Sequence, residues 1–184
     1  MKPVSAPQSD GAPERPALQY EPQAGRMAGA RENRTGEDSM QGAGEIAAFL
    51  AREFPAVFGP ERGCVVDVAE AGRAVCRLVP TDDHLRPGDI VSGPTMMMLA
   101  DATAYAALLS VYPGAIHAVT TNLSINFLRA LKATHPIVAE CEIIKPGKRL
   151  AVLTCEVRGK ESDEPAAHVV MTYSLPPVTR DTVL

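Results

Sequence analysis

The sequence of 184 residues contains no tryptophan, and aromatic residues make up only 4% of it. It carries a formal net charge of −4 and has no run of five or more basic residues. Proteins that bind nucleic acids usually present basic patches, or aromatic side chains that stack on bases. The composition therefore argues against a nucleic-acid partner.

Paired metal-ligand motifs are also lacking. The four cysteines, Cys64, Cys76, Cys141 and Cys155, form no C-x-x-C pair, and no histidine lies at ligand spacing from them. We therefore predict no metal site. Each cysteine lies in an apolar, strand-like run, where a buried reduced thiol is the usual state. The segment MKPVSAPQSDGAPERP has no apolar core of the kind that a secretory signal needs, so we predict a cytoplasmic protein with reduced cysteines.

Residues 1–42 lack a periodic apolar pattern and are rich in Pro, Gly, Ser and charged side chains. Such a segment cannot bury enough apolar surface to offset its conformational entropy, so we predict a disordered N-terminal tail. A chain of this length holds one core comfortably. We predict a single folded domain over 43–177 and a short C-terminal tail over 178–184.

The folded part shows two kinds of periodicity. EIAAFLAREFPAVFG places Ile46, Phe49, Leu50 and Phe54 on one face of a short helix that ends at Pro55. Two β-rich runs, near 64–69 and 73–79, flank a Glu-Ala-Gly turn and predict a hairpin. Four further β-rich runs are joined by short connections, which favour hairpins between consecutive strands; they span 117–130, 135–147, 148–159 and 165–177.

Between the hairpin and these strands lies SGPTMMMLADATAYAALLSVYPG, in which almost every side chain is apolar or small. Ser92 suits the N-cap of a helix, Pro94 suits its first turn, and Pro113-Gly114 ends it. A helix that is apolar on all sides is either buried or spans a membrane. The single charge at Asp101 and the amphipathic strands that follow favour a helix buried against a sheet, and hence an α+β fold.

Asp101 requires an explanation, because a buried carboxylate without partners is costly. One explanation is structural: the carboxylate is hydrogen-bonded to backbone groups or to a strand hydroxyl. The other is functional: Asp101 is a base or nucleophile in a half-buried site. The residues alone leave both explanations open.

Several motifs occur in an order that resembles the hotdog-fold acyl-CoA thioesterases of the PaaI-like group. They are H-x-x-P at 84–87, L-A-D at 99–101, V-T-x-x-L-x-I-x-F-L-R at 119–129, and G-K-R at 147–149. The resemblance covers residues 44–176. It implies an antiparallel sheet wrapped around one long central helix, with a short helix before it. It also implies a homodimer or homotetramer whose sites lie between subunits.

The resemblance assigns roles around the central helix. It implies that Asp101 activates a water or attacks the thioester directly. The backbone N–H of Gly93, at the helix N-terminus, would stabilise the oxyanion, and Thr120 would orient the water. The substrate would be an acyl-CoA, and no cofactor is expected beyond coenzyme A as part of that substrate.

At three positions the chain departs from the family pattern: Arg86 stands where the family has Asn, Ser92 where it has His, and Pro94 where it has a second Gly. Arg86 would contact the thioester oxygen or an acyl carboxylate, or pair with Asp101, and Ser92 would be an N-cap or a site residue. Contacts to the nucleotide of coenzyme A are expected from three cations near strand ends, Arg129, Lys148 and Arg149.

The alternative to an enzyme is a non-catalytic hotdog module that binds an acyl-CoA or lipid ligand, which the departures at Arg86 and Ser92 favour. A dehydratase is a third and weaker hypothesis. Dehydratases of this fold generally use a histidine with the acid, and Ser92 stands at that position here.

Overall fold

The computed structural model describes residues 42–112 and 114–176. The helices are α1 (Ala43–Glu53), α2 (Pro55–Phe58) and α3 (Gly93–Leu109), with 3₁₀ turns η1 (Asp82–His84) and η2 (Ala115–His117). The strands are β1 (Cys64–Glu70), β2 (Arg73–Leu78), β3 (Leu85–Arg86), β4 (Ile90–Val91), β5 (Val119–Phe127), β6 (Ile137–Lys145), β7 (Leu150–Gly159) and β8 (Pro165–Ser174). The predicted tails, 1–42 and 178–184, lie outside the described residues except for Gly42, so their boundaries stay predictions.

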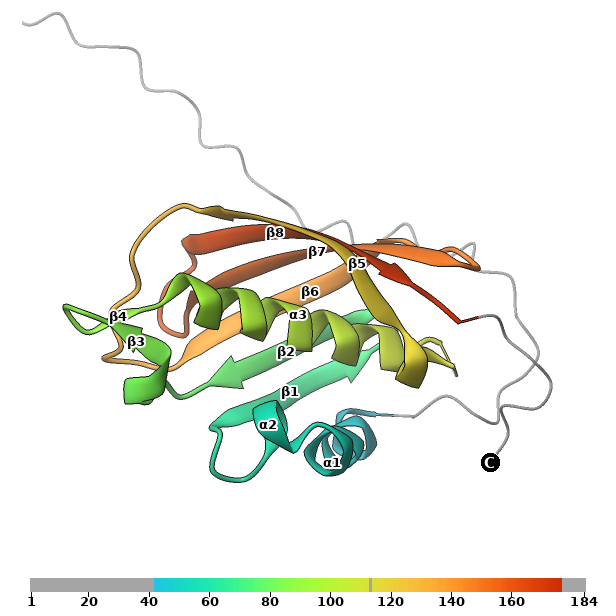
Figure 1. The fold of residues 1–184 in the computed structure, drawn as a ribbon, viewed down its shortest axis with the longest axis horizontal. Helices are drawn as coiled ribbons and strands as arrows, with labels where there is room; N and C mark the ends of the chain where they lie inside the picture. Colours follow the sequence, from blue (N-terminus) through green and yellow to red (C-terminus); the bar gives the residue numbers. More distant parts are fainter. Residues whose placement is uncertain (1–41, 113, 177–184) are drawn as a thin grey trace, which may run out of the picture. The chain divides into compact units, whose positions relative to one another are not determined.

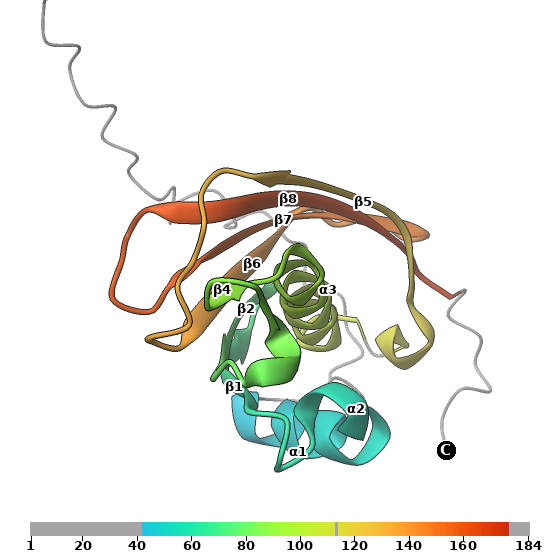
Figure 2. The ribbon, with the colours of Figure 1, turned by 60° about the vertical axis from the view of Figure 1, so that its left-hand side comes forward.

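One antiparallel sheet of six strands, in the order β1-β2-β6-β7-β8-β5, curves around α3 (Figures 1 and 2). The helices α1 and α2 lie beside β1, at the other end of the sheet from β5. The predicted α+β architecture, with one central helix inside an antiparallel sheet, is confirmed.

The predicted hairpin between the third and fourth long β-runs is wrong. β5 pairs with β8, at the edge of the sheet, and β6 pairs with β2 and β7. The connecting segment after β5 instead bonds to the loop before α3, where the Val91 N–H donates to the Leu131 carbonyl at 2.9 Å. A short connection therefore does not make a hairpin when another part of the chain satisfies its backbone groups.

The first helix forms as predicted and buries Ile46 and Leu50 against the core, but Phe49 is only half-buried and Phe54, the C-cap residue, is exposed. Pro55 ends α1, but it also occupies the first position of α2, where its missing N–H costs nothing. The predicted β1–β2 hairpin is confirmed as well. Its turn holds Ala71 and Gly72 at φ 48° and 84°, the left-handed pair that a tight two-residue hairpin requires.

The core lies between α3 and the concave face of the sheet. Small residues on α3, including Ala100, Ala104 and Ala107, are fully buried and let the helix approach the strands closely. On β7 the predicted apolar face is buried as a set: Ala151, Leu153, Cys155 and Val157. The polar loop 80–92 is more structured than predicted, because it contains η1, β3 and β4.

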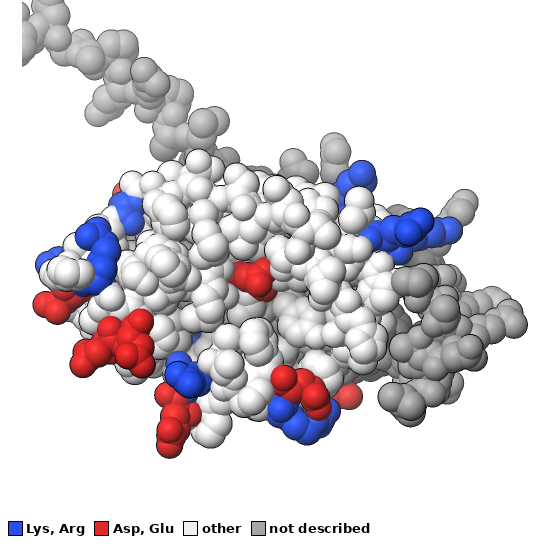
Figure 3. Space-filling model, in the orientation of Figure 1, with Lys and Arg blue, Asp and Glu red and all other residues white. Residues whose placement is uncertain are grey.

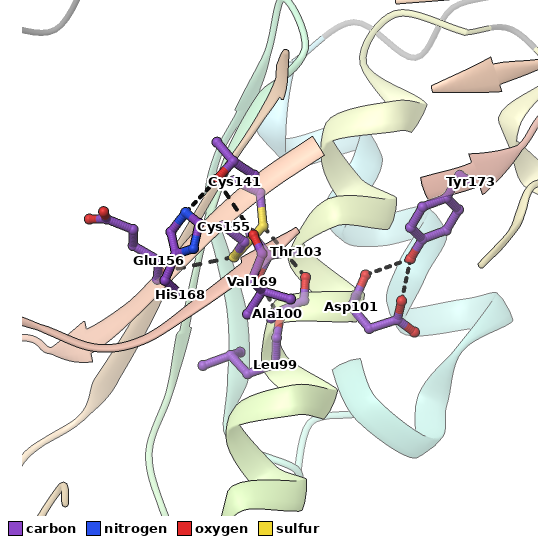
Figure 4. Close-up of a disulfide and its surroundings, with 11 residues drawn as sticks. Leu99, Ala100, Asp101, Thr103, Cys141, Cys155, Glu156, His168, Val169 and Tyr173 are labelled. Atoms are coloured by element: carbon purple, nitrogen blue, oxygen red, sulfur yellow. Dashed lines mark hydrogen bonds between the residues drawn. A yellow bond between two sulfur atoms is a disulfide. The ribbon is translucent and has the colours of Figure 1, made fainter. Parts of the chain in front are cut away.

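The prediction of four reduced cysteines is wrong for one pair. Cys141 and Cys155 form a disulfide (Figure 4). They are direct partners in the β6–β7 register, which the sequence alone does not reveal. Cys64 and Cys76 are free and buried, and hydrogen bonding to Cys76 together with burial raises the pKa of the Cys64 thiol well above its ordinary value.

Among the described residues, none of the helices combines the length and apolar character that crossing a bilayer requires.

Candidate active site

Helix α3 begins as the sequence predicted. The Ser92 hydroxyl accepts a hydrogen bond from the Thr95 N–H at 3.3 Å, and Pro94 is the second helical residue. The Thr95 hydroxyl donates to the His84 carbonyl at 2.9 Å, and the Ser92 N–H donates to the same carbonyl at 2.9 Å. These bonds fix the helix N-terminus to η1.

Gly93 is the first residue of α3. Its N–H is among the first-turn donors that have no partner within a helix. A Cβ at Gly93 would lie only 3.0 Å from Phe127 Cζ, so glycine permits the close approach of this aromatic ring from β5. The helix dipole and the open N–H groups favour negative charge at this point.

Asp101 lies in the middle of α3 and is half-buried. Its Oδ1 accepts hydrogen bonds from the Thr120 hydroxyl at 2.8 Å and from the Tyr173 hydroxyl at 2.6 Å (Figure 4 draws the tyrosine bond). Thr120 on β5 and Tyr173 on β8 are direct register partners, which is why both hydroxyls reach the same oxygen. The strand-hydroxyl contacts expected of a buried Asp are therefore present, and Thr120 supplies one of them.

Tyr173 was not predicted from the sequence. Burial, followed by the charge of Asp101, raises its pKa well above its ordinary value, so it is a protonated donor at neutral pH. A signal was available in β8, where Ala167, Val169, Met171 and Tyr173 share the buried face. Tyr173 is the member of this set with a polar side-chain atom, and a buried hydroxyl needs a partner.

Asp101 lines a pocket of about 320 Å³. Its other lining residues come from the α1–α2 junction, α3 and β5: Phe54, Val57, Pro94, Met97, Met98, Ala102, Thr120 and Leu123. Figure 3 shows a single acidic spot over α3, in the middle of a face whose other charges lie at the rim. Oδ2 of Asp101 has no hydrogen-bond partner among the described residues, while Oδ1 has two.

Gly93 and Asp101 do not meet within one chain. Asp101 follows Gly93 by eight residues on a continuous helix. At the helical rise of about 1.5 Å per residue, roughly 12 Å separates them along the axis. One thioester group therefore cannot contact both residues of the same chain.

The predicted cations are also dispersed. Arg86 is exposed on β3, and its side chain has no ion pair or hydrogen bond among the described residues, so it does not pair with Asp101 within the chain. Arg129 pairs with Glu164 near the start of β8. Lys148 and Arg149 are exposed in the β6–β7 turn, near the other end of β8.

The chain is similar to known proteins in both sequence and fold. Residues 88–166 match the family model described as "Thioesterase superfamily". The chain is similar to the crystal structure of a candidate thioesterase from Silicibacter sp., with 34% identity and a TM-score of 0.66 over 76% of this chain and 96% of the other. This chain belongs to the thioesterase superfamily.

Two further structures are similar in fold to this thioesterase superfamily chain. One is a mutant of the phenylacetic acid degradation protein PaaI from Thermus thermophilus, with 23% identity and a TM-score of 0.56 over 62% of this chain and 94% of that one. The other is a hypothetical thioesterase protein with coenzyme A from Streptococcus pneumoniae, with 18% identity and a TM-score of 0.57 over 64% and 91%. No curated protein sequence matches the chain. The hotdog fold and the resemblance to PaaI-like thioesterases are confirmed.

The superfamily match covers Gly93, Asp101 and Thr120, but not Arg86 or Tyr173. It also omits the two residues of the α1–α2 junction that line the pocket, Phe54 and Val57. In the described part of this thioesterase superfamily chain, no group of three or more His, Cys, Asp or Glu side chains could hold a metal ion.

Proposed function

We propose that the protein hydrolyses acyl-CoA thioesters in the pocket beside Asp101. The observation that carries this proposal is the hydrogen bonding of the two oxygens of the Asp101 carboxylate. Hydroxyls from β5 and β8 hold Oδ1, whereas Oδ2 has no partner among the described residues, and Asp101 lines an apolar pocket. A carboxylate held in this way can take a proton from a water molecule.

In the proposed reaction, Asp101 takes a proton from water as the water oxygen attacks the thioester carbonyl. The resulting oxyanion is stabilised by the Gly93 N–H at a helix N-terminus, and the intermediate collapses to the acid and coenzyme A thiolate. Direct attack by Asp101 would instead form a mixed anhydride that water then hydrolyses. A single turnover in ¹⁸O-labelled water tests for the anhydride, because water attack on its aspartyl carbon would leave labelled oxygen in Asp101, which the first route cannot do.

The separation of Gly93 and Asp101 supports a site shared between two copies of the chain. β5 is an edge strand of the sheet, and its region exposes Val119, Phe127 and Leu128 by more than half. An apolar edge strand is a ready surface for pairing with another chain. We therefore propose a homodimer as the minimum assembly, with β5 at the contact, and leave a homotetramer open. Light scattering measures the mass directly.

One observation supports a coenzyme A ester as the substrate. The protein from Streptococcus pneumoniae, whose fold is similar, has a crystal structure with coenzyme A. Lys148 and Arg149 are the stronger candidates for its phosphates, since Arg129 already pairs with Glu164. Arg86 lies in the loop before α3 and remains a candidate contact for the thioester. The Ser92 hydroxyl caps the helix, which favours a structural role over a catalytic one.

The pocket lining supports an uncharged, apolar acyl group. Apart from Asp101 and Thr120, its walls consist of apolar side chains, two of them methionines that adapt to different shapes. Its volume of about 320 Å³ holds roughly ten water-sized groups, which suits a medium chain or an aromatic acyl group better than an acetyl group.

The test of the proposal is a panel of acyl-CoAs of different length, with thiol release as the readout, for the wild type beside Asp101→Asn. We expect release from at least one medium-chain or aromatic substrate by the wild type and a large loss in the variant. Binding without turnover would instead support the second candidate, an acyl-CoA binding module. The capped Ser92 at the family's histidine position favours that candidate. No binding and no turnover would contradict both.

A cytoplasmic location stays a prediction. The Cys141–Cys155 disulfide is more typical of oxidising compartments. Alkylation of the protein in its native cells, before any reductant is added, would establish which redox state is present there.

A further inference from the structure

We propose that Tyr173 is a positioning residue for Asp101: its hydroxyl fixes Oδ1, and Oδ2 is thereby left as the oxygen that takes the proton. This inference rests on the proposed thioesterase reaction. Tyr173 lies outside the segment that matches the superfamily, so its role follows from the geometry of this chain.

The contact between Tyr173 and Asp101 is short and enclosed. The Tyr173 hydroxyl donates to Asp101 Oδ1 at 2.6 Å and lies 3.0 Å from the backbone carbonyl oxygen of the same residue. Tyr173 is only 2% exposed, and β8 is held between β7 and β5. The hydroxyl is therefore fixed relative to the helix turn that carries the carboxylate, as Figure 4 shows.

Thr120 alone would be a weaker support for the carboxylate. It is exposed and lies beside a bulge between Thr120 and Asn122, whereas Tyr173 is buried and lies where β8 pairs regularly with β7. A buried donor in a regular ladder has less freedom to move than an exposed donor at a bulge. The more rigid of the two donors to Oδ1 is therefore the tyrosine.

Few other titratable groups face this contact. The charge of Tyr105, one turn further along α3, adds to the effects of burial and Asp101 that raise the pKa of Tyr173. Burial, followed by the charge of Glu53 at the end of α1, raises the pKa of Tyr105. Neither β5 nor α2 contains a charged residue, and His168 on β8 contacts Thr154 on β7 instead. Because burial and Asp101 raise the pKa of Tyr173, the tyrosine stays protonated across the range in which a carboxylate base is active.

The positioning role has a consequence that a purely structural role lacks. A hydrogen bond donated to a carboxylate favours its charged form, so removal of the donor favours protonation. The acid side of the kcat/KM profile should therefore move to higher pH when the Tyr173 hydroxyl is removed. A structural role would lower kcat without moving this limb.

The experiment compares wild type with Tyr173→Phe, which keeps the ring and removes only the hydroxyl. Tyr112→Phe is the matched control, because the Tyr112 hydroxyl accepts a hydrogen bond from the Gly147 N–H at 3.1 Å and does not contact Asp101. Two readouts are taken on the full chain: the pH profile of thiol release, and the NMR chemical shift of the Asp101 carboxyl carbon at neutral pH.

In Tyr173→Phe we expect the acid limb to move to higher pH and the carboxyl chemical shift to change, with roughly a tenfold loss of kcat/KM because one hydrogen bond to a charged group is removed. Neither should change in Tyr112→Phe. An unchanged acid limb and an unchanged chemical shift in Tyr173→Phe would overturn the proposal, even if activity fell. If the wild type releases no thiol, the proposed function fails, while the carboxyl chemical shift still decides the role of Tyr173.

Discussion

The middle and the N-terminus of helix α3 both carry residues that the proposed reaction needs, but they are built differently. In the middle, Asp101 is held by hydroxyls from two strands of the same chain. At the N-terminus, Gly93 has a first-turn N–H with no partner within the helix and packs against the Phe127 ring. A half-buried charge needs its partners when the chain folds, whereas the N–H at a helix N-terminus can be satisfied by water until substrate arrives.

The largest effect is expected from the middle of α3. Asp101→Asn keeps the size and the accepting oxygen but cannot take a proton from water. We expect kcat to fall about 10³-fold, the usual contribution of a general base, with little change in melting temperature. Thiol release measured with the best acyl-CoA checks this. Activity equal to that of the wild type would show that Asp101 is structural only.

At the helix N-terminus, a matched pair of variants isolates the N–H group. Gly93→Ala and Gly93→Pro both add a Cβ against Phe127, but only proline removes the donor. We expect Gly93→Pro to lose about 100-fold more of kcat than Gly93→Ala, the typical value of one oxyanion donor. Equal losses in the two variants would assign the effect to crowding and remove Gly93 from the mechanism.

The two hydroxyls on Oδ1 should act together. Thr120→Val alone should lower kcat/KM roughly tenfold, because one hydrogen bond to a charged group is lost. Since the remaining hydroxyl still partly holds Oδ1 in each single variant, Thr120→Val combined with Tyr173→Phe should lose more than the product of the single losses. A double-mutant cycle measures this coupling, and strict additivity would argue against a shared hold on the carboxylate.

Alkaline stability is expected to reflect the buried tyrosine. The pKa of folded Tyr173 is raised above that of the unfolded chain, about 10, so the native state retains its proton at higher pH than the unfolded state does. Its contribution to stability is therefore complete below pH 10 and is lost as the pH rises further. Tyr173→Phe should have a flatter stability profile above pH 10 in denaturant titrations. Parallel wild-type and variant profiles would contradict the assigned burial.

The smallest effect is expected at the helix cap. Ser92→Ala removes the acceptor for the Thr95 N–H and should lower the free energy of unfolding by about 1 kcal/mol. Because the hydroxyl caps the helix and is not expected to contact the substrate, kcat should change less than about threefold. A loss of kcat comparable to that of Gly93→Pro would give Ser92 a place in the reaction after all.

The sequence revealed features that depend on local spacing. The helix face of Ile46 and Leu50, the cap at Ser92 and the isolated charge of Asp101 are all visible in short windows, and each lies where it was expected. The position of Thr120 came from the family resemblance. Local periodicity also found every long strand of the described part.

Features that depend on strand order and register were missed. The pairing of β5 with β8 brings Thr120 and Tyr173 side by side, and no local pattern shows which strands are neighbours. The Cys141–Cys155 disulfide was missed for the same reason, since both residues read as ordinary apolar strand positions. Long-range pairing is set by packing around α3, which single-strand periodicity does not encode.

The central claim is that Gly93 of one copy and Asp101 of another form one site. Two inactive variants, Asp101→Asn and Gly93→Pro, are mixed under conditions that exchange subunits. A mixed dimer then holds one site with both residues intact, and an equal statistical mixture should regain about one quarter of wild-type activity. No activity above that of the separate variants, in a mixture shown by mass to contain mixed dimers, would contradict a shared site.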